Sequence, residues 1–244
     1  MLAPQVAYST GIYWDLSRTA YFVIAPPVFS LEGRASRVEA PNNEATVYTV
    51  ASFMPLRTFL FQLEIPYISV VTQEAIQNEF GDPVFRLRVR LVRGDERALH
   101  LLGGIRLGSL PFLESNEQLF PYSTGSLDLS LGLAFVDTVG AVPWWISATG
   151  TMPTRVDTAI ADTYTRSSSV AGGAMGPLTD GVRLMIGALV TFQSGQTTRF
   201  AYYADLNWSY SATTGFYTFG QAESGSEDTR TIDYSVGIGT RITF

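Results

Sequence analysis

The run Phe85-Arg86-Leu87-Arg88-Val89-Arg90-Leu91 alternates apolar and cationic residues without a break. Successive side chains of a β-strand point to opposite faces, so this run has one apolar face and one face that carries three arginines. Such alternation predicts a strand that lies between an apolar and a polar environment. The same period recurs in Leu127 to Phe135, Val182 to Phe192, Phe200 to Tyr210 and Ile232 to Phe244.

The alternating runs are longer than the strands of most soluble sheets. A tilted strand needs about 9–11 residues to cross a bilayer, whereas soluble strands usually contain about 5–6. The predicted strands are residues 45–56, 58–71, 83–93, 97–110, 126–139, 142–153, 181–193, 197–212 and 231–244. A tenth strand is expected within residues 19–31, because a single-chain bacterial barrel has an even number of strands. Ten strands are the preferred count, with twelve and eight as alternatives.

The connections between the predicted strands alternate in length. Short turns are expected at residues 56–58, 93–97, 140–141 and 194–196, and long polar loops at residues 72–82, 111–125, 154–180 and 213–230. Short turns on one rim and long loops on the other are typical of outer-membrane barrels. A soluble β-sandwich, the alternative fold, has no reason to keep this alternation. We therefore predict an all-β, closed antiparallel transmembrane barrel over residues 19–244, with residues 1–18 as a lead-in or a small plug.

The composition suits a protein that faces lipid on one side and water on the other. Of its 244 residues, 46% are hydrophobic, 13% aromatic and only 16% charged, against about 25% charged in soluble domains. No run of about 20 apolar residues is present, so a membrane would have to be crossed by a closed barrel. Aromatic residues near strand ends are expected at the bilayer interface. They are Trp144, Trp145, Trp208, Tyr210, Phe216, Tyr217 and Phe219.

The two termini bear on export. Met1-Leu2-Ala3-Pro4 lacks the basic start and the apolar core of a secretory signal, and an exported barrel needs one. We therefore expect the signal peptide to have been removed before this numbering begins. The segment from Tyr234 to Phe244 resembles the closing strand of outer-membrane barrels, which alternates apolar residues and ends in Phe. That resemblance implies an assembly signal at Tyr234, Ile242 and Phe244, read by the barrel-assembly machinery of a Gram-negative bacterium.

Four further stretches resemble one particular family. They are Glu64-Ile65-Pro66-Tyr67, residues 81–87 (GDPVFRL), residues 103–111 (GGIRLGSLP) and residues 125–132 (GSLDLSLG). In this order they are similar to the outer-membrane transporter family associated with meta-cleavage phenol degradation, over about residues 60–135. The resemblance implies a transporter-like role and names no solute.

With the apolar faces outward, the opposite face carries most of the charged residues of the strands. These residues form the predicted lumen-lining and solute-binding set: Glu64, Arg86, Arg88, Arg90, His100, Arg106, Asp128, Arg183, Arg199, Asp205, Asp233 and Arg241. Seven arginines minus four carboxylates leave the lumen about three positive charges. Arginines that line a pore favour anions, so we expect a weak anion preference set by Arg86, Arg88 and Arg90. Alternatively, these charges pair across a filled barrel and satisfy one another.

Three function classes follow from this prediction. The first is a narrow pore or transport-related channel for small solutes, with outer-membrane lipid as its surroundings. The second is a sealed barrel that anchors or docks other envelope proteins. The third, an outer-membrane hydrolase, is disfavoured because His100 is the only histidine and no serine lies two residues away on its face. We predict no enzymatic activity, no cofactor and no metal ion, and the net charge of −6 argues against a nucleic-acid partner.

Overall fold

The computed structural model describes residues 29–39, 43–56, 58–71, 76–80, 82–94, 97–107, 127–154, 166–193, 198–211, 213–224 and 232–243, for some of which it describes the backbone alone. Within these ranges the chain forms thirteen strands and no helix, so none of the described residues belongs to a membrane-spanning helix. The strands are β1 (Phe29–Glu39), β2 (Asn43–Leu56), β3 (Phe59–Val71), β4 (Ile76–Phe80), β5 (Val84–Arg93), β6 (Ala98–Leu107), β7 (Leu127–Val139), β8 (Val142–Pro153), β9 (Ser167–Thr179), β10 (Val182–Gln193), β11 (Arg199–Ser209), β12 (Thr214–Ser224) and β13 (Ile232–Thr243).

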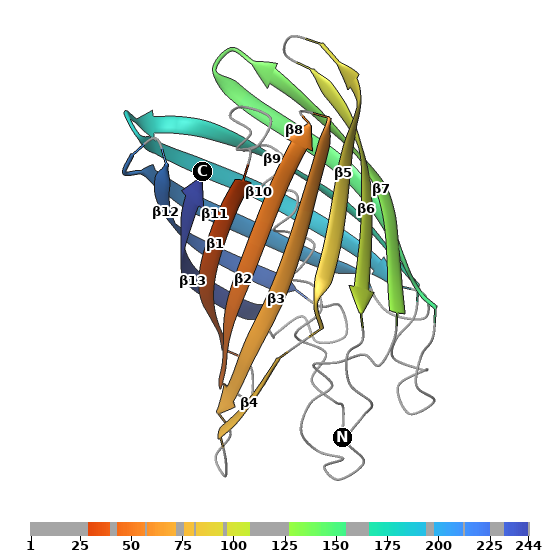
Figure 1. Ribbon diagram of the computed structural model, residues 1–244. Coiled ribbons are helices and arrows are strands. Elements are labelled where there is room, and N and C mark those ends of the chain that lie inside the picture. The colour runs from red at the N-terminus through yellow and green to blue at the C-terminus, as the bar shows by residue number, and fades with distance from the viewer. Residues whose placement is uncertain are drawn as a thin grey trace.

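All of these strands belong to one antiparallel sheet that closes on itself (Figure 1). From β5 to β13 each strand pairs with its neighbours in sequence, and β13 returns to pair with β1. The pairs β1–β2, β2–β3 and β3–β5 complete the ring. Short β4 pairs with Tyr67 to Val71 of β3, beyond the segment Phe59 to Glu64 that pairs with β5. The described ring therefore contains twelve strands, with β4 as an extension beside β3.

The predicted closed antiparallel transmembrane barrel is confirmed, and the nine predicted strand ranges coincide with β2, β3, β5, β6, β7, β8, β10, β11 and β13. The first strand begins at Phe29, later than expected, and residues 1–28 lie outside the described residues. The expected loops 154–180 and 213–230 contain β9 and β12, and the expected loop 72–82 contains β4. The ring of the described strands thus has the twelve strands of the larger alternative rather than the preferred ten.

The two missed strands lack the large apolar face that identifies the others. In the middle of β9 the outward residues are the small Gly172, Ala174 and Gly176, between Val170 and Leu178, and glycine is depleted in ordinary strands. In β12 large residues occupy both faces, because Tyr217 and Phe219 are buried in the interior while Phe216 is exposed outside. A search for large apolar residues at every second position therefore passes over both strands.

The two rims of the barrel differ in the length of their connections. On the short-turn rim, at the top of Figure 1, the connections after β2, β5, β7, β9 and β11 span two to four residues. Gly140 and Gly181 adopt φ values of 63° and 78° in two of these turns, a conformation that glycine reaches without strain. On the opposite, long-connection rim, residues 108–126 and 154–166 join β6 to β7 and β8 to β9. The predicted short turn at residues 194–196 belongs to this rim, because the missed strands shift the alternation.

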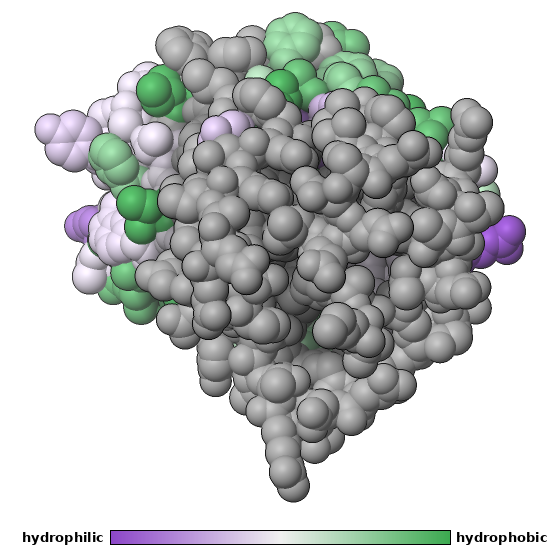
Figure 2. Space-filling view, turned by 90° about the horizontal axis from the view of Figure 1, so that it is seen from below, coloured by the Kyte–Doolittle hydropathy of each residue, from purple (hydrophilic) through white to green (hydrophobic). Residues whose placement is uncertain are grey.

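Large apolar side chains face outward around the barrel. Leu131, near the middle of β7, is 65% exposed, and Phe61, Phe85, Ile186 and Val236 are exposed on four other strands. Figure 2, seen from the long-connection end, shows hydrophobic described residues at the outer edge of the molecule. Such a surface would favour aggregation in water, whereas hydrocarbon solvates it.

Interior aromatic rings pack over glycines of the neighbouring strand. A Cβ atom on Gly173 would lie 2.5 Å from the carbonyl oxygen of Ile186 and 2.6 Å from Cζ2 of Trp145. A Cβ atom on Gly187 would overlap the ring of Tyr203. Only a glycine leaves space for each of these rings. The contacts between ring and glycine therefore help to fix the register of β8 with β9 and of β10 with β11.

The assignment of the two sheet faces predicts that an added arginine destabilises the barrel on the outer face and is tolerated on the inner face. Leu131→Arg puts a guanidinium against the bilayer and should lower the free energy of unfolding by about 2–4 kcal/mol. Thr151→Arg puts the same group on the polar interior face and should cost less than about 1 kcal/mol. Urea unfolding in lipid vesicles measures both values, and equal costs at the two positions would contradict the assignment.

Candidate functional site

One wall of the interior carries most of the charged residues that the structure describes at inward positions. Strands β3, β5, β6 and β7 are consecutive in the ring, and the polar side chains at their inward positions are buried or half-buried. They are Gln62, Glu64, Arg86, Arg88, Arg90, His100, Arg106, Asp128 and Ser130. The alternate residues, such as Phe85 and Ile105, are exposed on the outside. We call these four strands the arginine wall.

Two ion pairs lie on the arginine wall near the long-connection rim. Nη1 of Arg86 is 2.6 Å from Oε2 of Glu64, and both side chains are at least nine-tenths buried. Nη1 of Arg106 is 3.7 Å from Oδ2 of Asp128. Charge-assisted pairs of this kind compensate groups that are withdrawn from water. These four predicted residues are therefore held together as two neutral pairs.

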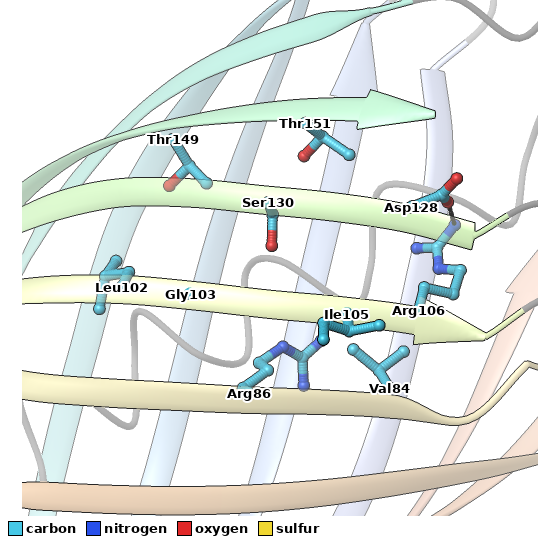
Figure 3. Close-up of a pocket in the computed structure, with 10 residues that line it drawn as sticks. All are labelled: Val84, Arg86, Leu102, Gly103, Ile105, Arg106, Asp128, Ser130, Thr149 and Thr151. Atoms are coloured by element: carbon cyan, nitrogen blue, oxygen red, sulfur yellow. Dashed lines mark ion pairs between the residues drawn. The ribbon is translucent and has the colours of Figure 1, made fainter. Parts of the chain in front are cut away.

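A cavity of about 70 Å³ lies beside these pairs. Its lining is Val84, Arg86, Leu102, Gly103, Ile105, Arg106, Asp128, Ser130, Thr149 and Thr151 (Figure 3). Figure 3 shows Arg86 of β5 and Ser130 of β7 directed toward each other across β6. The intervening inward residue is Gly104, where a Cβ atom would overlap Oγ of Ser130. The cavity thus combines guanidinium and hydroxyl donors, and the hydroxyls at Ser130, Thr149 and Thr151 are additions to the predicted set.

Arg88, Arg90 and His100 lie closer to the short-turn rim. Arg90 is the register partner of His100, and Arg88 that of Leu102. His100 has an exposed fraction of 0%, and neither of its ring nitrogens has a hydrogen-bond partner within the part of the chain that the structure describes. The three side chains therefore form a compact polar group among buried neighbours.

The wall opposite the arginine wall is apolar and aromatic. In the ring of twelve, β10, β11 and β12 lie six places from β3, β5 and β6. Their buried inward side chains are Met185, Leu189, Ala201, Tyr203, Tyr217 and Phe219. Several of them belong to one cluster with Val136, Trp145 and Met175. At the depth of this apolar cluster the inward side chains are shielded from water, whereas the cavity lies toward the long-connection rim.

The aromatic residues divide between the two faces of the sheet. Phe216 and Tyr210 are exposed, and Trp144 is half-buried on the outer face. Trp145 and Tyr217 are buried inside, as is Phe219, so the expectation that all of these rings face the bilayer interface was wrong. Successive side chains of a strand point to opposite faces, so two adjacent aromatic residues cannot both face the bilayer.

The remaining predicted residues belong to β10, β11 and β13 or follow β13. Asp205 is half-buried on β11, opposite β5, and Arg183 is exposed at the short-turn rim. Ile242 is exposed on the outer face of β13. The side chains of Arg199, Asp233, Tyr234 and Arg241, and the whole of Phe244, lie outside the described residues.

The polar groups of the arginine wall are mainly hydrogen-bond donors. The register partners of His100 are Arg90 and Ala134, whereas a hydrolytic histidine requires a nucleophile on one side and an orienting carboxylate on the other. Among the residues with described positions, no three or more histidine, aspartate or glutamate side chains come together as a metal site would require. Guanidinium, imidazole and hydroxyl groups are instead donors that suit an anion.

Solved structures share this fold, although no family model and no curated protein matches the sequence. NanC porin superposes with a TM-score of 0.64 at 9% identity, covering 88% of this chain and 100% of that chain. The COG4313 outer membrane channel from Pseudomonas putida F1 gives 0.63 at 12%, covering 88% and 94%. KdgM porin gives 0.58 at 7%, covering 88% and 99%. The chain therefore has the fold of outer-membrane β-barrels, and at these identities the likeness says nothing about the solute.

The buried pair of Arg86 and Glu64 should be strongly coupled. Arg86→Leu leaves a buried carboxylate without its cation and should lower the free energy of unfolding by about 3–5 kcal/mol, and a second change, Glu64→Leu, should restore most of that loss. The pair of Arg97 and Asp137 at the short-turn rim, at 3.1 Å with Arg97 73% exposed, is the control, where Arg97→Ala should cost at most about 1 kcal/mol. Urea unfolding of the single and double variants gives the coupling, and additive costs for Arg86 and Glu64 would contradict it.

Proposed function

We propose that this barrel resides in the bacterial outer membrane as a narrow channel for small solutes, with a preference for anions. The observation that carries the proposal is the row of Arg86, Arg88 and Arg90 at successive inward positions of β5. Such positions are about 6.8 Å apart, twice the rise per residue of a strand. A row of guanidinium groups in a confined lumen offers an anion several weak sites in sequence, which is what conduction requires.

Arg88 and Arg90 are expected to set the preference. Arg86 and Arg106 are each neutralised by a carboxylate within 4 Å. Arg88 lies between Leu60 of β3 and Leu102 of β6 at the next inward position of β5.

The alternative is a sealed barrel that anchors or docks other envelope proteins. The burial of His100, Trp145 and Met175 favours it, because an open lumen would expose inward side chains to water. The resemblance of residues 60–135 to the transporter family associated with meta-cleavage phenol degradation favours transport. No enzymatic reaction is proposed, and the barrel-assembly machinery remains the partner that we expect for biogenesis.

Current measurements in planar lipid bilayers test this proposal. The native barrel should conduct with a weak anion preference, and the double variant Arg88→Gln/Arg90→Gln should lower the anion-to-cation permeability ratio by about twofold or more, because it removes lumen charge. Arg86 is left in place, because its removal would leave the buried carboxylate of Glu64 without its cation. Arg93→Gln, at the exposed end of the same strand, should change the ratio little, because water and salt screen exposed charges within about 8 Å.

Two results would decide against the proposal. A native barrel that is folded but passes no current would favour the sealed alternative. Conduction with an unchanged ratio in the double variant would mean that the row on β5 does not line the path.

A further inference from the structure

We infer that the cavity beside the two ion pairs of the arginine wall is a binding site for one small uncharged polyol, a molecule with hydroxyl groups on a short carbon chain. Residues of β5, β6, β7 and β8 line this cavity (Figure 3). Arg88 and Arg90, to which we assign the anion preference, lie further along β5 and outside the described lining. The inference therefore goes beyond the proposed channel, because binding in the cavity does not require that the barrel conducts.

Hydroxyl groups from two neighbouring strands line one side of the cavity. Ser130 of β7 is the register partner of Thr151 of β8. Thr149 is the inward residue before Thr151 on the same strand, so it lies about 6.8 Å away along β8. All three side chains are half-buried and belong to the cavity lining. Their hydroxyl groups are therefore presented to a molecule that occupies the cavity.

Two glycines on the adjoining strands make room for these hydroxyl groups. Ser130 lies over Gly104 of β6, where a Cβ atom would overlap its Oγ atom. Thr149 lies over Gly132 of β7, where a Cβ atom would be 2.8 Å from its Oγ1 atom. Protein interiors have no spare space for such overlaps. The positions of both hydroxyl groups therefore depend on a glycine in the neighbouring strand.

The charges beside the cavity are already balanced. Nη1 of Arg86 is 2.6 Å from Oε2 of Glu64, and Nη1 of Arg106 is 3.7 Å from Oδ2 of Asp128. The other described side chains of the lining carry no charge. A charged ligand would bring an uncompensated charge into a space that is partly withdrawn from water, which costs free energy. An uncharged ligand avoids that cost.

Hydrogen bonding and size favour a polyol among uncharged molecules. A hydroxyl group is both a donor and an acceptor, so the serine and threonine side chains can pair with hydroxyl groups of a ligand in either sense. Val84 and Leu102 add apolar surface for a short carbon chain. The cavity measures about 70 Å³, and one water molecule needs at least about 10–15 Å³ of such space, so it holds about five waters. Glycerol is of that size and carries a hydroxyl group on every carbon atom.

Saturation-transfer NMR measures ligand binding to the barrel in a detergent that has no sugar headgroup, so that the detergent does not compete. Glycerol should bind. Its analogue 1-propanol has the same carbon chain with a single hydroxyl group and should bind at least about tenfold more weakly, because hydrogen bonds are lost. Glycerate, which replaces one end of glycerol with a carboxylate, should also bind about tenfold more weakly, because its charge is uncompensated in the cavity.

Variants of the lining test which residues hold the ligand. Ser130→Ala/Thr151→Val removes two hydroxyl groups at nearly constant volume and should weaken glycerol binding about tenfold. Thr151→Ser keeps the hydroxyl group and should stay within about threefold of the native affinity. Thr191→Val is the matched control, because Thr191 is a half-buried inward residue of β10 outside the described lining, and it should change the affinity less than about twofold. A shift between unheated and boiled samples on a denaturing gel shows that each variant has folded.

The outcomes separate this site from the channel function. Equal binding of glycerol and 1-propanol, binding of glycerate as tight as that of glycerol, or unchanged glycerol binding in the folded double variant would overturn the site. Glycerol binding with the expected pattern in a barrel that passes no current would support the site and refute the channel. Conduction with the expected anion preference but without glycerol binding would refute the site and support the channel.

Discussion

Closure of the hydrogen-bond ladder is the constraint from which the rest of this molecule follows. Hydrocarbon offers no partner for a backbone N–H or C=O group, so a sheet inside a bilayer cannot keep a free edge. Here β13 meets β1 from Ser30 opposite Thr243 to Glu39 opposite Tyr234, and this ladder joins the two ends of the sheet. Once the ring is closed, each strand has one face toward lipid and one toward the interior. A slip of one residue would exchange those faces along a whole strand, so the apolar and polar patterns must agree with the register everywhere.

The size of the ring decides which interior side chains face each other. In a ring of twelve, β5 lies opposite β11 and β6 lies opposite β12. The arginines of β5 and the single histidine therefore face a wall that carries Tyr203, Tyr217 and Phe219. The diameter of a barrel grows with the number of its strands, so β9 and β12 also create the width that the cavity and the buried rings occupy. The division between a mainly cationic and a mainly apolar wall is thus a consequence of strand order.

Much of this architecture could be predicted from the sequence, because period-2 alternation records which face meets lipid. The runs around Leu131, Ile186 and Val236 were assigned to the correct face on that basis. The strands β9 and β12 could not be found in this way. The middle of the outer face of β9 is built of small residues, and large residues lie on both faces of β12, so hydrophobicity does not separate their two faces.

The candidate site, too, could be predicted from the sequence only in part. Parity along a strand is enough to place Arg88, Arg90 and His100 on the interior face. The pair of Arg86 and Glu64 depends on the register between β3 and β5, which β4 separates in the sequence, and the sequence carries no direct record of that register. Arg183 follows the inward parity but lies exposed at a rim, because parity does not indicate depth. Depth and cross-strand pairing are therefore properties that only the closed ring supplies.

A disulfide cross-link between β1 and β13 examines the closure itself. The chain has no cysteine, so Ala35→Cys/Ile238→Cys introduces one pair at partnered positions of the closing ladder, where the Cα separation of about 4.5–5.5 Å is compatible with a disulfide. The pair Leu101→Cys/Leu133→Cys, between β6 and β7, is the control within one hairpin. A twelve-stranded closed barrel predicts that both pairs form the disulfide in oxidised membranes, seen as altered migration on a non-reducing gel. A disulfide in the control pair but none between residues 35 and 238 would show that β1 and β13 are not neighbours and would contradict the closed ring.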